Sequence, residues 1–203
     1  MRLAVSSKTI KLNQAMKPET IVRTYIKKIR PQFQKELNWF RQQPTLSEAI
    51  RTAALAINSN GKRYSHQRRL EKKALEKACD LLLAIEREIS RTKDFDELFA
   101  LIQQRISPIK GLGELYAYDV ALRIGAKRGI LPERVYLHAG TRVGAKSLGL
   151  NHRAKTLEVP QLPDWLQQFQ PCEIEDILCI FKDKFKYLEK ADSKDLMNRS
   201  WCG

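Results

Sequence analysis

The sequence lacks any long apolar run. No stretch approaches the roughly eighteen residues needed to span a membrane, and residues 1–8 have no apolar core of the signal-peptide kind. The four cysteines form no Cys-x-x-Cys pair, and no Cys/His spacing suits zinc. We therefore expect a soluble protein of a reducing, cytoplasmic setting that holds no metal and no cofactor.

Strand-like patterns and acidic residues are also scarce. No run of alternating apolar and polar residues exceeds four, which predicts an all-α fold. Aspartate and glutamate number 23 against 37 lysines and arginines, which gives a net charge of +14. The apolar content of 43% is still typical of a globular protein. A globular chain that is this basic favours a polyanionic partner.

The positive charge is concentrated in three blocks. Residues 1–43 carry ten lysines and arginines against two acids, residues 61–73 carry six against one, and residues 105–155 carry ten against three. Residues 74–104 and 156–203, by contrast, each have a net charge of −3. No basic stretch is paired with a free apolar face of the membrane-binding kind. We therefore expect nucleic acid, preferably double-stranded DNA, as the partner, and no membrane.

Apolar residues at helical spacing divide the chain into helices. The spacing predicts helices over residues 18–30, 32–42, 46–57, 66–89, 95–106, 114–127 and 173–190, a short helix around 165–169, and an extended segment at 133–138 that turns into a helix. We expect a basic, loosely ordered arm over 1–17, a single helical domain over 18–191 that can divide into two lobes, and a frayed tail over 192–203.

A glycine hairpin joins two of these helices. Pro108 stops the helix over 95–106, and Gly111 and Gly113 precede the helix over 114–127. Glycines at such a turn can adopt positive φ and allow backbone N–H groups to approach an anion, and Lys110 adds a cation there. We expect Lys110, Gly111 and Gly113 to contact a DNA phosphate, with a plain helix–helix connection as the alternative.

Other basic residues stand at expected helix starts. Ser65 is expected to cap the helix over 66–89, which would place Arg68 and Arg69 in its first turns, against the helix dipole. A phosphate contact would explain such a placement. Arg142 and Lys146, in the helix that follows the extended segment, are expected to add further contacts with DNA.

The hairpin region resembles a known family. Ile109–Gly113 has the apolar-x-Gly-apolar-Gly pattern of the helix-hairpin-helix element, and Val135–His138 followed by Arg142–Val143 resembles the Val-Asp-x-His and Arg-Val segments of helix-hairpin-helix DNA glycosylases. That superfamily includes endonuclease III-like and adenine glycosylases. The resemblance covers about residues 94–150, and it implies a glycosylase-like, all-helical fold and a role in DNA binding or repair.

Three departures from the family concern its chemistry. The family's essential aspartate falls on Tyr136, and the lysine of its lyase-competent members falls on Leu115, which has no amine for a Schiff base. Cys172 and Cys179 match the first spacing of the iron–sulfur members, but Lys182 stands where the third cysteine is due. The usual base-excision residues are therefore absent at the matching positions.

Polar residues near the expected cleft are the remaining catalytic candidates. Asp119 can serve as a relocated base, with a structural pairing to Arg123 as the alternative. His138 and Tyr136 are weaker candidates, with helix capping and core packing as their respective alternatives, and His66 comes from a separate helix.

Three hypotheses on function follow from these patterns. The first is a DNA-binding protein of glycosylase-like fold that performs no base excision. The second is a divergent DNA glycosylase or other DNA-processing enzyme that uses Asp119 or His138. The third is an RNA- or protein-interaction scaffold. The sequence does not predict an oligomeric state.

Overall fold

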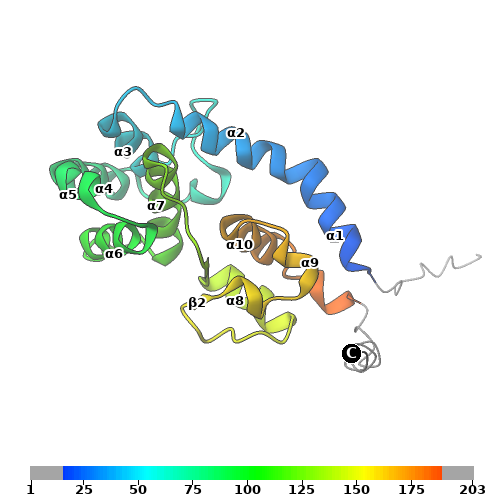
Figure 1. The fold of residues 1–203 in the computed structure, drawn as a ribbon. Coiled ribbons are helices and arrows are strands. Elements are labelled where there is room, and N and C mark those ends of the chain that lie inside the picture. Colours follow the sequence, from blue (N-terminus) through cyan, green and yellow to red (C-terminus); the bar gives the residue numbers. More distant parts are fainter. Residues whose placement is uncertain (1–15, 189–203) are drawn as a thin grey trace, which may run out of the picture.

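The computed structural model describes residues 16–188, which are mostly helical with a small two-stranded sheet (Figure 1). The elements of the first half are α1 (Pro18–Thr24), the π-helical turn η1 (Tyr25–Ile29), α2 (Arg30–Arg41), α3 (Leu46–Ala54), η2 (Ser65–Gln67), α4 (Lys72–Ala84), α5 (Glu86–Arg91) and α6 (Phe95–Ile106). Those of the second half are α7 (Glu114–Arg128), β1 (Val135–Tyr136), α8 (Ala139–Ser147), β2 (Thr156–Leu157), η3 (Val159–Gln161), α9 (Asp164–Gln167), α10 (Pro171–Ile180) and η4 (Phe185–Tyr187).

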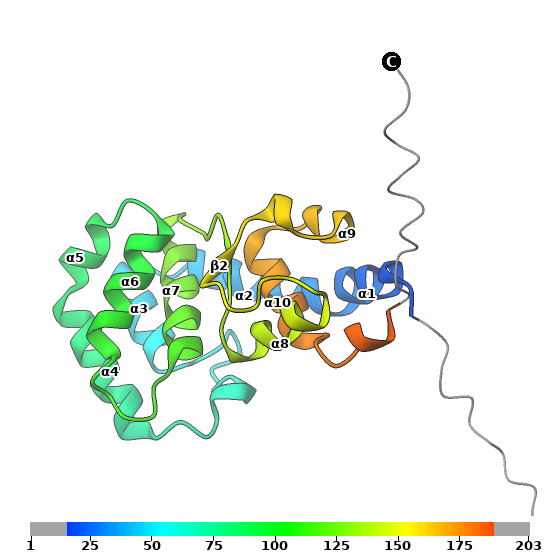
Figure 2. The same cartoon turned by 90° about the horizontal axis from the view of Figure 1, so that it is seen from below.

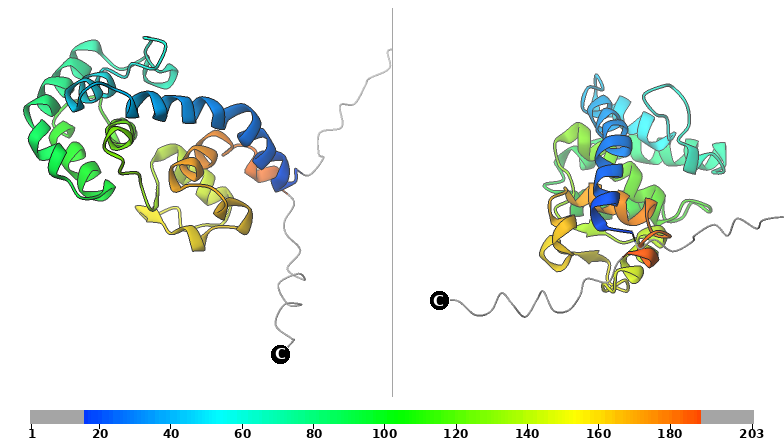
Figure 3. Two further views of the ribbon diagram at one scale, coloured as in Figure 1. Left: turned by 45° about the horizontal axis from the view of Figure 1, so that its top comes forward. Right: turned by 90° about the vertical axis from the view of Figure 1, so that its right-hand side faces the viewer.

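The helices pack around two hydrophobic clusters (Figures 1 and 2). The first cluster joins the second half of α2 to α3, α4, α5, α6 and α7. The second joins α1 to β1, α8, α9 and α10. The long helical run from α1 to α2 contributes to both clusters and extends from one group of helices to the other, as the ribbon in Figure 3 shows from two further sides.

This helical run does not end at Pro31, where the sequence predicts a break. Arg30 donates its backbone N–H to the carbonyl of Tyr25, five residues back, so the helix widens into a π-helical turn just before the proline. A proline inside a regular α-helix clashes with the carbonyl four residues earlier and removes a hydrogen bond. The wider turn changes the backbone geometry just before the proline, and the run continues through Pro31 as α2, so the prediction of two separate helices is wrong.

The segment before α4 is the largest departure from the predicted helices. The sequence predicts a helix from His66, but residues 65–67 form a 3₁₀ turn and α4 begins at Lys72. Side-chain contacts hold the segment in this form, because Gln67 bonds to Asp119 and Arg63 donates to the carbonyl of Leu70 at 3.0 Å. The predicted continuation to residue 89 is also interrupted, because Ile85 has φ −111° and ψ 22° between α4 and α5.

The helices on either side of the hairpin confirm the prediction. Helix α6 ends at Ile106, and its buried residues include Leu98, Phe99 and Ile102. Helix α7 occupies residues 114–128 and ends at Gly129, whose φ is +75°. Helix α3 is capped by Thr45, whose hydroxyl accepts the backbone N–H of Glu48 at 3.1 Å.

The last third of the chain contains the small sheet. The predicted extended segment is β1, which pairs antiparallel with β2 so that Val135 lies opposite Leu157. This sheet corrects the all-α prediction to a mostly helical fold. Helix α10 ends at Ile180 rather than near residue 190, and the turns that follow return Phe185 to the second cluster.

The predicted arm and tail fall largely outside the described residues. Residues 1–15 and 189–203 are not described, so the expectations for 1–15 and 192–203 are not addressed. Met16, near the end of the predicted arm, donates its backbone N–H to the carbonyl of Tyr187 at 2.7 Å. Across residues 16–188, no helix combines the length and the apolar character that a transmembrane span requires.

Candidate functional site

The hairpin between α6 and α7 borders a surface hollow of about 290 Å³. Lys110 and Gly111 line it from the hairpin, and Arg69 and Glu71 line it from the segment before α4. Lys110 and Arg69 are both exposed. The structure thus brings together two cations that stand 41 positions apart in the sequence, beside a turn whose backbone is accessible.

The two hairpin glycines differ in conformation. Gly111 has φ +92°, which confirms the expectation of a left-handed residue in the turn. Gly113 has φ −100° and occupies the N-cap position of α7, so the expectation of positive φ there is wrong. A Cβ atom built on Gly113 meets no atom within 4 Å.

The other basic candidates have different surroundings. Arg68 and Lys146 are exposed, and among residues 16–188 the side chain of neither makes a hydrogen bond or ion pair. Arg142 is engaged within the protein, because its guanidinium donates to the carbonyls of Ala154 at 2.7 Å and His152 at 3.2 Å. It also lies 3.8 Å from Glu114 at the start of α7. Arg142 therefore contributes to local structure, unlike Arg68 and Lys146.

A second cavity of about 370 Å³ lies where the helical run from η1 to α2 faces α7 and α10. Apolar and aromatic side chains, including Phe33, Phe40 and Tyr64, form part of its wall. The ionisable residues that line it are Lys28, Glu36, Tyr64, His66, Asp119, Arg123, Glu175 and Asp176. Asp119, the leading catalytic candidate from the sequence, therefore faces a cavity.

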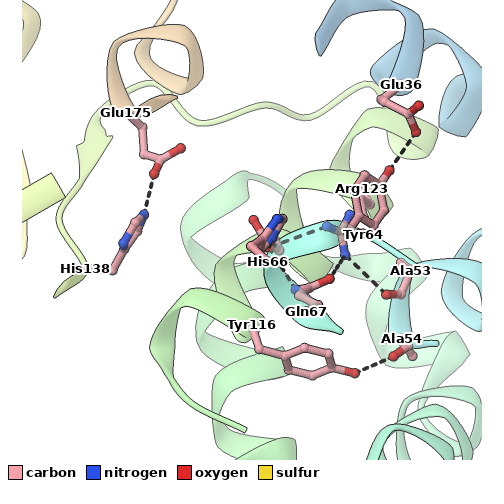
Figure 4. A network of polar contacts seen from close by, with 11 residues as sticks. Glu36, Ala53, Ala54, Tyr64, His66, Gln67, Tyr116, Arg123, His138 and Glu175 are labelled. Atoms are coloured by element: carbon pink, nitrogen blue, oxygen red, sulfur yellow. Dashed lines mark hydrogen bonds and ion pairs between the residues drawn. The ribbon is translucent and has the colours of Figure 1, made fainter. Parts of the chain in front are cut away.

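Three donors hold one oxygen of Asp119. His66 Nε2 lies 2.7 Å from Asp119 Oδ2, Gln67 Nε2 donates to the same atom at 2.8 Å, and the Arg123 guanidinium lies 3.4 Å from it (Figure 4). Within the described part of the chain, Oδ1 makes no hydrogen bond. The carboxylate is thus fixed through one oxygen, and the other oxygen has no protein partner.

Arg123 is itself held in a buried position. It is 6% exposed, and its guanidinium lies 3.9 Å from the ring centre of Tyr64. The same group donates to Gln67 Oε1 at 3.1 Å. The hydroxyl of Tyr64 donates to Glu36 at 2.7 Å, which links this group to α2. The expected Asp119–Arg123 pairing is therefore present as one part of a larger network.

Two carboxyl groups of α10 complete the cavity wall. Burial, followed by the neighbouring charges of Glu175 and Asp119, raises the pKa of Asp176 to about 7. Burial also raises the pKa of Glu175, partly offset by its hydrogen bond to His138. Neither residue stands out in the sequence, because acids in the first half of a helix are commonly explained by the helix dipole.

The two other catalytic candidates lie away from the cavity. Tyr136 donates its hydroxyl to Asp96 and packs on Phe99, with ring centres 5.0 Å apart. His138 is 2% exposed and bonded to Glu175 through Nε2, while its backbone N–H donates to Thr141 at the start of α8. Neither side chain lines the cavity.

No group of three or more potential metal ligands is present among residues 16–188. Cys172 and Cys179 lie on α10 as free thiols, and burial raises the pKa of Cys172 to about 12 and that of Cys179 to about 11. What the described residues offer instead is a basic hollow at the hairpin and a carboxylate-lined cavity. The chain was compared with protein-family models, curated proteins and solved structures, and none of them matches it.

Proposed function

We propose that this protein binds nucleic acid, with double-stranded DNA as its preferred ligand, and that its fold is related to the helix-hairpin-helix DNA glycosylases. The hollow formed by Arg69, Lys110 and Gly111 is the observation that carries the proposal. A phosphate in it would meet two cations and the backbone of a turn that leads into α7. Glu71 also lines the hollow, so the local balance of charge is one positive unit.

The wider surroundings support the same ligand. Residues 105–155 carry ten lysines and arginines against three acids, and Arg68 and Lys146 are exposed without partners among the described residues. The relation to glycosylases is supported by the hairpin pattern at Ile109–Gly113 and by the β1–α8 segment, where the resemblance places Val135–His138. The departures at Leu115 and Tyr136 leave the usual excision chemistry without its residues.

Salt-dependent binding tests this proposal. We expect affinity for a DNA duplex to fall with rising salt, with a log–log slope of about −0.9 for each phosphate contacted. Lys110→Ala and Arg69→Ala should each reduce the magnitude of the slope by about one. Arg68→Ala and Lys146→Ala should act in the same direction. Arg142→Ala should change the slope less, because its guanidinium is bonded to carbonyl groups of the protein.

Arg91 provides a matched control. It is exposed at the end of α5, beside Thr92, which Arg128 contacts at the far end of α7 from the hairpin. Helix α7 has 15 residues, and a helix of that size is about 22 Å long. Arg91→Ala should leave the slope unchanged. Equal reductions of the salt-dependence slope by Arg91→Ala and Lys110→Ala would indicate a diffuse charge effect instead of a defined phosphate site. Stronger binding of RNA than of duplex DNA would favour the hypothesis of an RNA- or protein-interaction scaffold.

A second candidate function is hydrolysis of the N-glycosidic bond of a nucleotide in the cavity. The observation that favours it is the position of Asp119, whose Oδ2 is held by three donors while Oδ1 is without a protein partner at the cavity. A fixed carboxylate beside a partly apolar cavity is suited to base chemistry or to stabilising a cationic sugar intermediate. His138 is a poorer candidate because it is buried away from the cavity.

Base release from DNA tests the second candidate. Duplexes containing uracil, hypoxanthine, 8-oxoguanine or 3-methyladenine are incubated with the protein, and abasic sites are revealed by alkaline cleavage. If the activity exists, Asp119→Asn should fold and bind DNA normally but lose base release. Wild-type protein that leaves every duplex intact would exclude this function and leave the DNA-binding proposal in place.

A further inference from the structure

We propose that His66 is the proton-transferring catalytic residue of this cavity, that Asp119 positions it, and that the substrate is the sugar–base part of a nucleotide whose phosphate occupies the hairpin hollow. This inference rests on the second candidate function. It assigns the chemistry to a residue that matches none of the family positions identified in the sequence.

The first argument is the geometry of His66. Its Nε2 atom lies 2.7 Å from Asp119 Oδ2, and a carboxylate can only accept hydrogen bonds, so Nε2 carries the proton. In a neutral ring the Nδ1 atom is then an acceptor. Among the described residues nothing bonds to Nδ1, and the side chain is 47% exposed at the cavity. The ring can therefore take a proton from a water molecule or a substrate.

The second argument is the rigid support of Asp119. Gln67 is 3% exposed and Arg123 is 6% exposed, and both donate to the oxygen that contacts His66. Gln67 in turn accepts from Arg123 at 3.1 Å. These bonds fix the carboxylate, and the carboxylate fixes the tautomer and the orientation of the imidazole.

A comparison with the other histidine–carboxylate pair separates a catalytic arrangement from a structural one. His138 and Glu175 form a similar pair, but His138 is 2% exposed and its Nδ1 atom is buried without a partner (Figure 4). No substrate can reach that ring without a change of structure. Of these two pairs, His66–Asp119 alone combines an anchored carboxylate with an accessible imidazole.

The third argument is the short connection between the cavity and the hairpin. Arg69 lines the hollow and His66 lines the cavity, and they are three residues apart. Their Cα atoms are therefore at most about 11 Å apart. This distance is short enough for a strand whose phosphate contacts Arg69 and Lys110 to reach the cavity with a neighbouring sugar and base.

The charge of the cavity selects the part of the nucleotide that enters. Glu36 and Asp119 offset Lys28 and Arg123, and burial favours the neutral forms of Glu175 and Asp176, so the cavity offers a phosphate no net positive charge. The hollow accommodates the phosphate better, and the cavity suits the neutral sugar–base part. His66 Nδ1 takes a proton from water, the water oxygen forms a bond to C1′, and the C1′–N bond breaks with its electron pair on the base nitrogen. The imidazolium then returns the proton to the departing base, so that one water is consumed and no redox partner is required.

The test compares His66→Gln and His66→Gly with Asp119→Asn in the base-release assay, with DNA binding measured in parallel. Glutamine can donate to Asp119 but cannot accept a proton, so His66→Gln should lower single-turnover base release at least a hundredfold with unchanged affinity. Added imidazole should restore part of the rate of His66→Gly, because the exposed position admits it. His152→Gln, a partly exposed histidine that does not line the cavity, is the control and should keep full activity.

Two results would overturn this assignment in distinguishable ways. Full activity of His66→Gln together with an inactive Asp119→Asn would make Asp119 the direct base and leave the second candidate function standing. Absence of base release by the wild-type protein would exclude both the assignment of His66 and the second candidate function. An independent readout is the ¹⁵N chemical shifts of the His66 ring, which should show a proton on Nε2 in the neutral ring and lose that preference in Asp119→Asn.

Discussion

Replacing Asp176 with asparagine should stabilise the protein at alkaline pH. Asp176 lines the cavity from α10, and burial, followed by the charges of Glu175 and Asp119, raises its pKa from 3.8 to about 7. The folded protein therefore binds more protons at this site than the unfolded chain between about pH 4 and pH 7, and its stability falls as the pH rises through that window. Above the window the buried charge opposes folding.

The magnitude follows from the shift. Each unit of pKa shift corresponds to about 1.36 kcal/mol, so a shift of about three units limits the destabilisation by the charged Asp176 to about 4 kcal/mol. Relaxation and water penetration reduce this penalty, and we expect Asp176→Asn to raise the free energy of unfolding by about 1–3 kcal/mol at pH 8. Removing the charge of Asp176 also lessens the electrostatic repulsion on the neighbouring Glu175, whose pKa is also raised, and this further increases the free energy of unfolding. At pH 4 the two proteins should have nearly equal stability.

The assay is guanidinium denaturation of both proteins at the two pH values, with equal m-values as the requirement for comparison. Asp183→Asn, at an exposed position beyond α10, is the control and should show no such dependence. An increase in the free energy of unfolding that is the same at pH 4 and pH 8 would refute the electrostatic explanation, because it would arise from packing or hydrogen bonding instead of charge. A loss of stability at pH 8 would show that the carboxylate has a stabilising partner.

Four further substitutions test the fold by the same denaturation assay. Gly111→Ala should lower the free energy of unfolding by about 1–2 kcal/mol because of its φ of +92°. Gly113→Ala should change it by less than about 0.5 kcal/mol, because Gly113 has an extended backbone and open surroundings. Equal costs for the two variants would contradict the hairpin geometry. Gly144→Ala should lower the free energy of unfolding by about 2–4 kcal/mol, since its Cβ would lie 2.2 Å from the carbonyl oxygen of Leu178. A variant of unchanged stability would mean that α8 and α10 lie farther apart than this structure places them. Arg128→Ala should cost about 1–3 kcal/mol by removing donors from the carbonyls between α5 and α6, and a neutral result would show that water replaces them.

The sequence predicts those helices whose apolar spacing agrees with their surroundings. Residues 95–106 are of this kind, because the buried positions of α6 recur at helical intervals. Helix α7 is buried almost continuously from Tyr116 to Ala126, and its extent is instead marked by the breaks at its two ends. The start of α4 is not predictable in this way, since residues 65–71 have helical composition but are held by bonds to the distant Asp119. Local patterns carry no information about such tertiary contacts.

The candidate site was predictable only in part. Asp119 can be selected because no other acid lies in 115–132, and Lys110 because it stands inside the glycine hairpin. Glu175 and Asp176 join the cavity through the packing of α10 on the rest of the fold, and nothing in their local sequence distinguishes them from ordinary helix-dipole residues. The contact of His66 with Asp119 likewise depends on a turn that the periodicity of the sequence obscures.

The composition of the two hydrophobic clusters has a consequence for synthesis on the ribosome. The first cluster draws almost entirely on residues 37–126, so it can close as soon as α7 has emerged. The second joins Ile21 and Tyr25 to residues 135–185, and it is incomplete until the last of these has been translated. The apolar side of α1 must therefore wait, exposed to water and to chaperones, for well over a hundred further residues to be added. Nascent chains arrested once α7 has left the exit tunnel should thus combine a protease-resistant centre with a cleavable N-terminal helix.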